Sequence, residues 1–419
     1  MIELNGFLFC FLLLYVGQSA FNILLEQINL AYSRLLSGKP PAGFEGFIDE
    51  TKLARGVDYS QEKARVGIIE QIASDAVLLA ILLSGLLPHL VGWSDKLGLS
   101  LIASGILFFF VPGLIHSLVE LPFSYYYTFV VEEKFGFNRS TLKLWLIDHI
   151  KGGLISAVFF ALILSFLLLF IEWSPRLWWL WGFVLLSAVQ LVMALLYPVV
   201  LAPLFNKFEP VRDGELSARI KEAMEKSGIR VKKILQMDAG KRSRHTNAYF
   251  TGIGKTKQIV LFDTLIESHT PDEILAVLAH EAGHYRKKHV IKQLVVFAAF
   301  SLAGFYATWL FIRWPLLFTT FGFSRPLPYV GLFLAGILWS KAGFFLQPLY
   351  MAMSRRFEKE ADMFAVHMLG SGAAMATAIK RLAADNLSNL NPHPLYVRFH
   401  YSHPPLVERI KDLAEWASR

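Results

Sequence analysis

Seven long apolar runs divide this 419-residue chain, and they limit what it can fold into more than any other feature. The runs cover roughly residues 6–25, 71–92, 99–121, 152–172, 177–200, 290–312 and 327–349. A helix needs about 20 apolar residues to cross the hydrocarbon core of a bilayer, and each run has about that length. Charged residues make up 18% of the chain, against about 25% in soluble domains. The sequence therefore predicts seven membrane-spanning helices surrounded by lipid.

The loops between these runs differ in their content of lysine and arginine. Residues 31–65 carry six basic residues and residues 124–151 carry four, whereas the alternate loops near 93–98, 173–176 and 313–326 carry one or two each. Cytoplasmic loops are usually the basic ones. We therefore expect the N-terminus outside, and the 31–65 loop, the polar segment before the sixth run and the C-terminus in the cytoplasm. These loops also account for the net charge of +8, so we expect no nucleic-acid partner.

A metal-ligand motif lies in the polar segment before the sixth run. Residues 280–284 read H-E-x-x-H, which is a zinc-hydrolase signature when it lies on a helix. A proline and two acidic residues directly after Thr270 predict the start of such a helix. Residues four apart share one helix face. We therefore expect His280 and His284 to bind one zinc ion per chain, with Glu281 as the general base.

A catalytic zinc site uses three protein ligands and a water, so a third ligand has to come from elsewhere. His289 is one residue away from the position that a metzincin would use, and we expect it to be a solvated residue on a basic face. Glu358 is the best candidate for the third ligand. Asp362 follows one turn later on the same face, where it could hold a ligand histidine by its second nitrogen. Glu360 is the alternative ligand, but it points to a different face from Asp362.

The positions of the spans agree with this ligand set. Two apolar runs lie between His284 and Glu358, and two spans return the chain to the side of the membrane that it left. We expect residues 1–205 to form the first five spans with their loops, 206–289 a cytoplasmic catalytic segment, 290–352 the last two spans, and 353–419 a cytoplasmic C-terminal segment.

The catalytic segment also contains strand patterns. Residues 229–237 alternate between polar and apolar side chains, which is typical of a strand. Residues 245–250 and 258–262 flank a turn containing Gly252 and Gly254, which predicts a hairpin. A helix of about 14 residues is expected after Asp213.

A few ionisable residues lie within the apolar runs, namely Asp75, His116, Glu120 and Lys341. Charges at membrane depth usually face the interior of a helix bundle or a water-filled cavity. The alternative is that they lie near the ends of the spans and extend to the membrane surface.

Several motifs, taken in order, resemble the CAAX prenyl protease 1 family of integral-membrane zinc peptidases, which is related to the HtpX-type proteases. The matching pieces are residues 132–138, 202–208, 247–249, 259–265, the H-E-x-x-H motif, 354–358 with 361–362, and 400–405. The resemblance implies a membrane all-α fold in which seven transmembrane helices form an α-barrel around a water-filled chamber. It places the zinc site in a mainly helical cytoplasmic domain that contains a small β-hairpin or sheet.

The resemblance also implies roles for individual residues. It implies that zinc is bound by His280, His284 and Glu358, and that Glu281 is the general base. It further implies that His403 and Arg409 assist at the transition state, and that Asn247, Ala248 and Tyr249 lie in a substrate-binding strand. The family cleaves prenylated CAAX peptides in eukaryotes; for a bacterial source, a role in clearing membrane-associated or misfolded peptides is an equal alternative.

The sequence thus predicts an integral-membrane zinc metalloendopeptidase that acts on a peptide or protein substrate. A membrane channel or transporter is an alternative, but it leaves the H-E-x-x-H motif and the Glu358/Asp362 pair unexplained, and no inverted repeat supports it. An intramembrane protease of the site-2 type would carry the motif within an apolar span. Here a basic stretch at residues 285–289 follows the motif directly, which favours a membrane surface.

Overall fold

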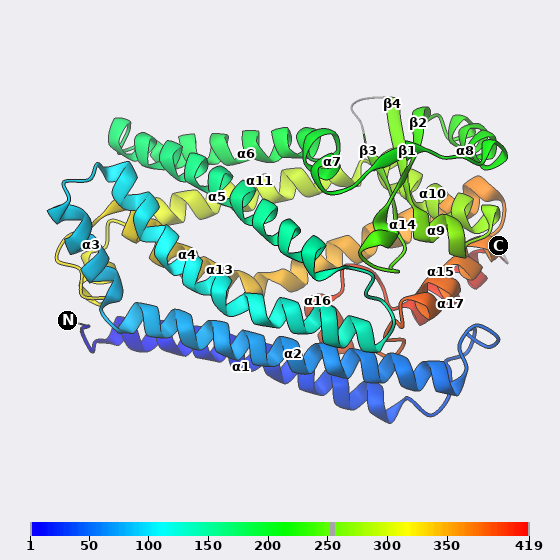
Figure 1. Cartoon of the computed structure of the whole chain (residues 1–419), viewed down its shortest axis with the longest axis horizontal. Helices are drawn as coiled ribbons and strands as arrows, with labels where there is room; N and C mark the ends of the chain where they lie inside the picture. The colour runs from blue at the N-terminus through cyan, green and yellow to red at the C-terminus, as the bar shows by residue number, and fades with distance from the viewer. Residues whose placement is uncertain (1, 252–255, 418–419) are drawn as a thin grey trace.

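In the computed structural model, which describes residues 2–251 and 256–417, the apolar runs form long helices that lie lengthwise along the molecule (Figure 1). Seven helical segments of the described residues are long and apolar enough to span a membrane, as predicted. They are α1 (Gly6–Leu35), α2 (Glu50–Leu83), α4 (Leu101–Tyr126) with η1 (Tyr127–Glu132), α5 (Leu142–Trp173), α6 (Trp178–Leu196) with η2 (Tyr197–Leu201) and α7 (Ala202–Phe205), α11 (His289–Phe311), and α13 (Pro328–Gly343) with η4 (Phe344–Leu346) and α14 (Gln347–Leu369).

The second span differs from the run 71–92 that the sequence suggested. Helix α2 begins at Glu50, where the Asp49 side chain accepts a hydrogen bond from the backbone of Lys52, and it ends at Leu83. Gly85 then adopts φ 81°, a left-handed conformation that suits glycine. A separate helix, α3 (Leu86–Lys96), follows. The prediction of one span over 71–92 is therefore wrong, because the chain turns at this glycine.

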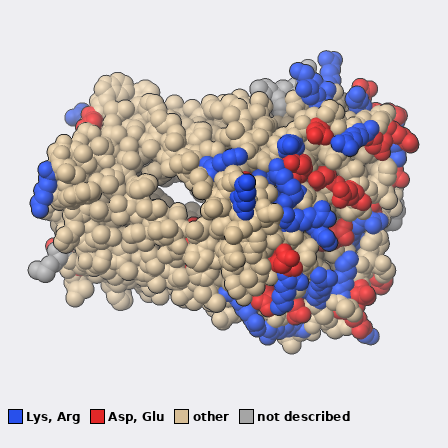
Figure 2. Space-filling model, in the orientation of Figure 1, with Lys and Arg blue, Asp and Glu red and all other residues tan. Residues whose placement is uncertain are grey.

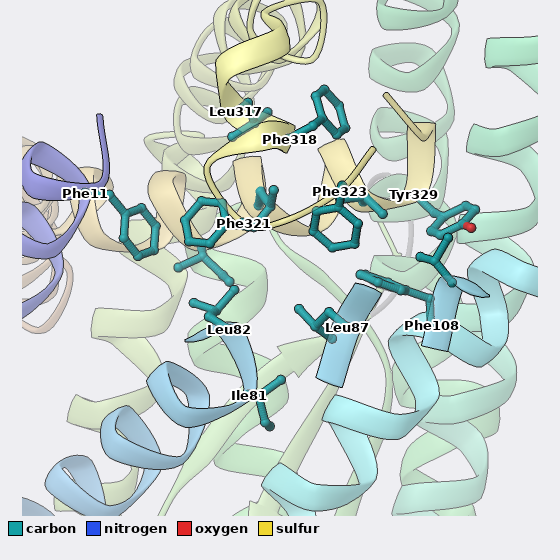
Figure 3. Packing of buried hydrophobic residues seen from close by; sticks show 14 of the residues in the cluster. Phe11, Ile81, Leu82, Leu87, Phe108, Leu317, Phe318, Phe321, Phe323 and Tyr329 are labelled. Carbon is teal, nitrogen blue, oxygen red and sulfur yellow. The ribbon is translucent and has the colours of Figure 1, made fainter. Parts of the chain in front are cut away.

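A cluster of buried apolar side chains closes the end of the helix bundle near the N-terminus (Figure 3). Helix α3 and the connection between α11 and α13, which includes α12 (Pro315–Thr319), contribute to it. Phe108 of α4 packs against Phe323 and Tyr329, and Phe321 lies edge-on to Phe11 of α1. Apolar burial therefore fixes this end of the bundle.

The opposite end carries a small sheet whose strands are β1 (Phe208–Pro210), β2 (Arg230–Met237), β3 (Ala248–Thr251) and β4 (Thr256–Phe262). The described strands are ordered β1-β2-β4-β3; β2 and β4 run parallel, and the other neighbours run antiparallel. The predicted strand and the two strands of the predicted hairpin are confirmed. The expected turn residues Gly252 and Gly254 lie outside the described residues.

Helices complete this end of the molecule around the sheet. They are α8 (Gly214–Lys226), η3 (Ala239–Lys241), α9 (Asp263–Ser268), α10 (Pro271–Arg286), α15 (Ala373–Asp385), α16 (Pro394–His400) and α17 (Leu406–Ala417). Helix α8 begins after Asp213, as expected, and packs on α10 and β2 through an apolar cluster. Figure 2 shows that charged side chains gather at this end and that an opening lies between the helices near the middle of the view.

Charged groups within the spans are paired. The Nζ atom of Lys341 on α13 lies 2.8 Å from an Asp75 carboxylate oxygen on α2, and Ser19 and Tyr15 of α1 also bond to this carboxylate. This pair therefore faces the interior of the bundle, as expected. His116 and Glu120 form an ion pair of 3.0 Å along α4, with both side chains about half exposed.

Candidate metal centre and peptidase site

Helix α10 carries the H-E-x-x-H motif, and its start is fixed by reciprocal capping bonds. The Thr270 hydroxyl accepts from the backbone N–H of Glu273, and the Glu273 carboxylate accepts from the backbone N–H of Thr270 at 2.7 Å. Arg381 of α15 donates to the same carboxylate at 3.0 Å. The predicted helix start is confirmed.

Small residues allow α10 and α14 to cross closely. A Cβ atom added to Gly283 would lie 2.9 Å from the Cα atom of Ala361, which is closer than real Cβ atoms approach. Glycine at this position therefore lets the two helix backbones touch. The crossing brings the motif histidines to the face of α14 that carries Glu358.

His280, His284 and Glu358 converge, with their ligand atoms all within 4.8 Å of one another. The two Nε2 atoms lie 3.1 Å apart, and each lies 3.2–3.3 Å from a Glu358 oxygen. The Oε2 atom of Glu358 is buried and is the oxygen that lies 3.3 Å from Nε2 of His280. Two ring nitrogens and a carboxylate directed at one point form the two-histidine, one-glutamate donor set of catalytic zinc sites. The residues present therefore fit a zinc ion.

A carboxylate behind the first ligand fixes its ring. The Asp362 Oδ1 atom lies 2.7 Å from Nδ1 of His280, so this nitrogen carries the proton and Nε2 is free to bind a metal. Without a metal, burial disfavours the charged ring, but hydrogen bonds to Asp362 and Glu358 outweigh it and raise the pKa of His280 to about 9. A metal bound at Nε2 would take the place of the proton on that nitrogen. Arg409 of α17 donates to both Asp362 oxygens, at 2.8 and 2.6 Å. Arg409 thus holds the carboxylate that bonds to His280.

His289 is not the solvated residue that the sequence suggested. Lys288 adopts φ 57°, so the chain breaks between α10 and α11 and His289 turns inward, where it is 1% exposed. Its Nδ1 atom lies 3.0 Å from Nδ1 of His284, and its Nε2 atom lies 3.2 Å from the Glu360 carboxylate. The ring also stacks on Phe357 at 4.3 Å. Glu360 therefore lies behind His289 and outside the group of three converging ligands.

Two of the three expected catalytic side chains, Glu281 and His403, lie beside the metal ligands. Burial raises the pKa of the Glu281 carboxyl, and the neighbouring His280 and His284 partly offset this rise. His403, in the segment before α17, places its Nδ1 atom 2.6 Å from Oε2 of Glu358. More than half of the His403 side chain is exposed, so it borders open space next to the ligands.

The segment Asn247-Ala248-Tyr249 leads into β3, the edge strand of the described sheet. Ala248 pairs with Leu261 of β4, and the Asn247 side chain accepts from the backbone N–H of Ala248 at 2.8 Å. Helix α10 packs beside β3. An extended peptide could therefore add to this edge close to the motif.

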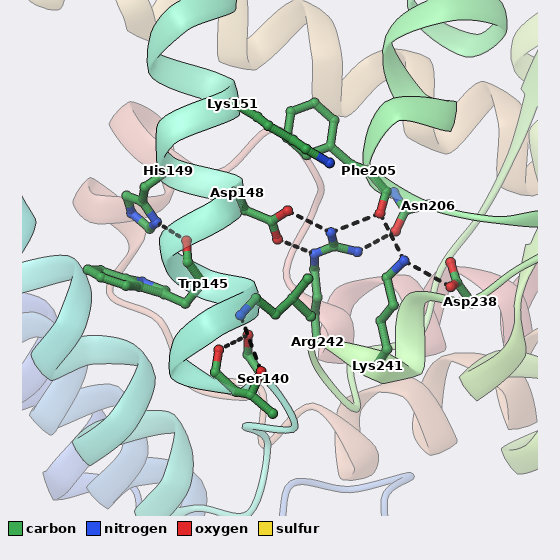
Figure 4. A network of polar contacts seen from close by, with 12 residues as sticks. Ser140, Trp145, Asp148, His149, Lys151, Phe205, Asn206, Asp238, Lys241 and Arg242 are labelled. Carbon is green, nitrogen blue, oxygen red and sulfur yellow. Dashed lines mark hydrogen bonds and ion pairs between the residues drawn. The ribbon is translucent and has the colours of Figure 1, made fainter.

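A polar network that the sequence did not reveal holds the approach to β3 (Figure 4). Arg242 makes two bonds to the Asp148 carboxylate of α5, at 2.7 and 2.9 Å. It also donates to the Asn206 side chain and to the backbone oxygen of Phe205. Asn206 lies in one of the motifs noted above, but its partner Arg242 is 36 residues away. The network ties the end of the fifth span to the segment that precedes β3.

A cavity of about 840 Å³ opens beside His403 and Arg409. It is lined by residues of α1 and α2, by His245, by residues 386–389, and by C-terminal residues that include His403 and Arg409. Ligand pockets usually have volumes of about 300–1,000 Å³. His403, which contacts the ligand Glu358, therefore borders a space large enough for part of a peptide.

Two family models together match nearly the whole chain. The model for the CAAX prenyl protease N-terminal region, five membrane helices, matches residues 31–207, and that of peptidase family M48 matches residues 210–417. CAAX prenyl protease 1 of Saccharomyces cerevisiae is 35% identical over 91% of this chain and 90% of its own length. The Arabidopsis thaliana homologue is 35% identical over 88% of this chain and 89% of its own length, and the human one is 32% identical over 74% of each.

A solved structure matches the fold over the same extent. The crystal structure of S. mikatae Ste24p has a TM-score of 0.90 and 33% sequence identity, and it covers 96% of this chain and 97% of its own. The similarity spans the membrane helices as well as the metal site, and the relatives do not favour a channel or transporter. The chain therefore belongs to the CAAX prenyl protease 1 family within peptidase family M48, and it is an integral-membrane metallopeptidase with a helical chamber.

Proposed function

We propose that this protein hydrolyses peptide bonds with one zinc ion per chain, bound by His280, His284 and Glu358. The observation that carries the proposal is the convergence of two ring nitrogens and a buried carboxylate, whose ligand atoms all lie within 4.8 Å of one another. Zinc in such a site polarises the scissile carbonyl and makes a water nucleophilic at neutral pH.

The side chains around this point have complementary roles. Glu281 accepts a proton from the attacking water and later passes it to the leaving amine. His403 donates to the carbonyl oxygen as negative charge develops there, which is typically worth about 3–4 kcal/mol. Arg409 acts through Asp362 because it donates to both oxygens of that carboxylate.

The substrate binds as an extended strand on Asn247, Ala248 and Tyr249, so that main-chain hydrogen bonds supply affinity. We propose that it is a prenylated CAAX peptide, since the named relatives are CAAX prenyl proteases. The cavity next to His403 lies between the polar end and the membrane helices. This position suits a substrate with a lipid chain and a polar peptide.

The proposed orientation places the N-terminus outside and both the metal site and the C-terminus in the cytoplasm. Basic loops support it, because the 31–65 and 124–151 loops lie toward the charged end in Figures 1 and 2. A reporter fused after residue 419 should read as cytoplasmic, and one at the N-terminus as external. Reporters that place both ends on one side would contradict this orientation.

The function is tested with purified protein and a farnesylated CAAX peptide. Chelation should abolish cleavage, and added zinc should restore it with about one zinc per chain. A peptide of the same sequence without the farnesyl group should be cleaved more slowly. Cleavage that survives complete zinc removal would rule out the metal mechanism, and equal rates on both peptides would rule out recognition of the prenyl group.

A further inference from the structure

The cavity that His403 and Arg409 line contains a cation that pairs with no carboxylate in the part of the chain that the structure describes. Lys63 of α2 lines the cavity, and its ammonium lies over the rings of Tyr59 and Tyr127 at 5.0 and 5.7 Å. Among the described residues, no carboxylate forms an ion pair with it. The described carboxylate that lines the same cavity, Glu26, is bonded to the Tyr396 hydroxyl. Lys63 is therefore available to an anion in the cavity.

A second group that can carry a positive charge, His245, lines the same cavity as Lys63. The ring of His245 contacts the Glu132 carboxylate at 3.3 Å and the Asn386 side-chain oxygen at 2.7 Å, and it stacks on Phe137 at 4.5 Å. The bond to Glu132 raises the pKa of His245, and burial only partly opposes it. When His245 is protonated, Glu132 neutralises one of the two cations, and this corner of the cavity keeps about one positive charge.

The position of His245 is fixed by its neighbours along the chain. It follows Arg242 by three residues, and Figure 4 shows the Arg242 guanidinium held between Asp148 and Asn206. The Tyr59 hydroxyl donates to the Glu132 carboxylate that His245 contacts. Because contacts with several elements hold His245 and Glu132 in place, these side chains form a preorganised binding surface.

The direction of β3 indicates which part of a bound peptide would lie near Lys63 and His245. His245 precedes the N-terminal end of β3, whose first residue is Ala248. A peptide that adds antiparallel to β3 has its carboxyl end at this end of the strand. The residues after the scissile bond would then run toward His245, and His403 and Lys63 line the same cavity.

We propose that Lys63 and His245 form a subsite for the free α-carboxylate of the substrate's last residue. The inference rests on the proposed function, because a CAAX motif lies at the C-terminus of its protein and therefore ends in a carboxylate. One excess positive charge complements one carboxylate. The subsite would favour substrates with a free C-terminus that lies a few residues beyond the scissile bond.

The test uses full-length protein with zinc and two farnesylated CAAX peptides that differ only in ending in a carboxylate or a carboxamide. The wild type should prefer the carboxylate by about 10–100-fold in kcat/KM, mainly through KM, since a charged hydrogen bond is lost with the amide. Lys63→Met should reduce that preference to a few-fold and leave the carboxamide rate nearly unchanged. Lys63→Arg should retain much of the preference.

Arg65→Met is the matched control, because Arg65 lies on the same helix but is not among the residues that line the cavity. It should keep the wild-type preference. Equal cleavage of both peptides by the wild type would overturn the subsite while leaving the peptidase intact. An equal loss on both peptides in Lys63→Met would give Lys63 a structural role instead. If the wild type cleaves neither peptide, the proposed function and the subsite both fail.

Discussion

Replacing His289 with phenylalanine should weaken zinc binding without unfolding the protein. The His289 ring contacts Nδ1 of His284 at 3.0 Å and the Glu360 carboxylate at 3.2 Å, and it stacks on Phe357. Phenylalanine keeps the stacking and nearly the same volume but removes both ring nitrogens. Loss of such an outer partner typically costs about 10–100-fold in metal affinity, which is about 1.4–2.7 kcal/mol.

The assay is competition for zinc between the purified protein and a chelator, with thermal unfolding of the zinc-free protein as a check on folding. Arg356→Gln is the control, because Arg356 contacts Glu360 from a side chain that is 79% exposed and does not touch a histidine. It should bind zinc like the wild type. A folded His289→Phe protein with wild-type zinc affinity would refute the argument that His289 orients His284.

Three further predictions follow from the contacts above. His403→Ala should lower turnover by about 100–1000-fold with zinc content and KM nearly unchanged, which steady-state kinetics and metal analysis would check. Lys341→Met should destabilise the protein by about 3–5 kcal/mol, because it leaves Asp75 without its partner. Thermal unfolding should show part of this loss recovered when Asp75→Asn is added, and no recovery would argue against the pair. His245→Gln should cost more thermal stability at about pH 6 than at about pH 9. Protonated His245 stabilises the folded state through Glu132, and this contribution is complete when the pH is below the ordinary histidine pKa. It is lost as the pH rises through the raised pKa of His245.

The spans and the donor set could be predicted because their signals are local. Each span is a run of apolar residues of sufficient length, and His280 and His284 share a face because they are four residues apart. Glu358 and Asp362 follow the same spacing on a second helix. The sequence therefore indicated that Asp362 could hold a ligand histidine, and Asp362 lies 2.7 Å from Nδ1 of His280.

The parts that could not be predicted depend on single backbone angles or on distant partners. His289 is buried because Lys288 takes a left-handed conformation, which a lysine seldom adopts and no pattern indicated. Arg242 and Asp148 are 94 residues apart, so neither indicates the other. The turn at Gly85 is different, since a glycine within an apolar run is a signal that could have divided 71–92 into two helices.

Glu281→Gln is the decisive variant, because Glu281 is the proposed base of the zinc-dependent hydrolysis. This variant removes the proton acceptor and none of the three converging ligands, His280, His284 and Glu358. Purified Glu281→Gln should retain about one zinc per chain while cleavage of the farnesylated peptide falls about 100–10,000-fold. A zinc-loaded Glu281→Gln protein that turns over as fast as the wild type would contradict the account.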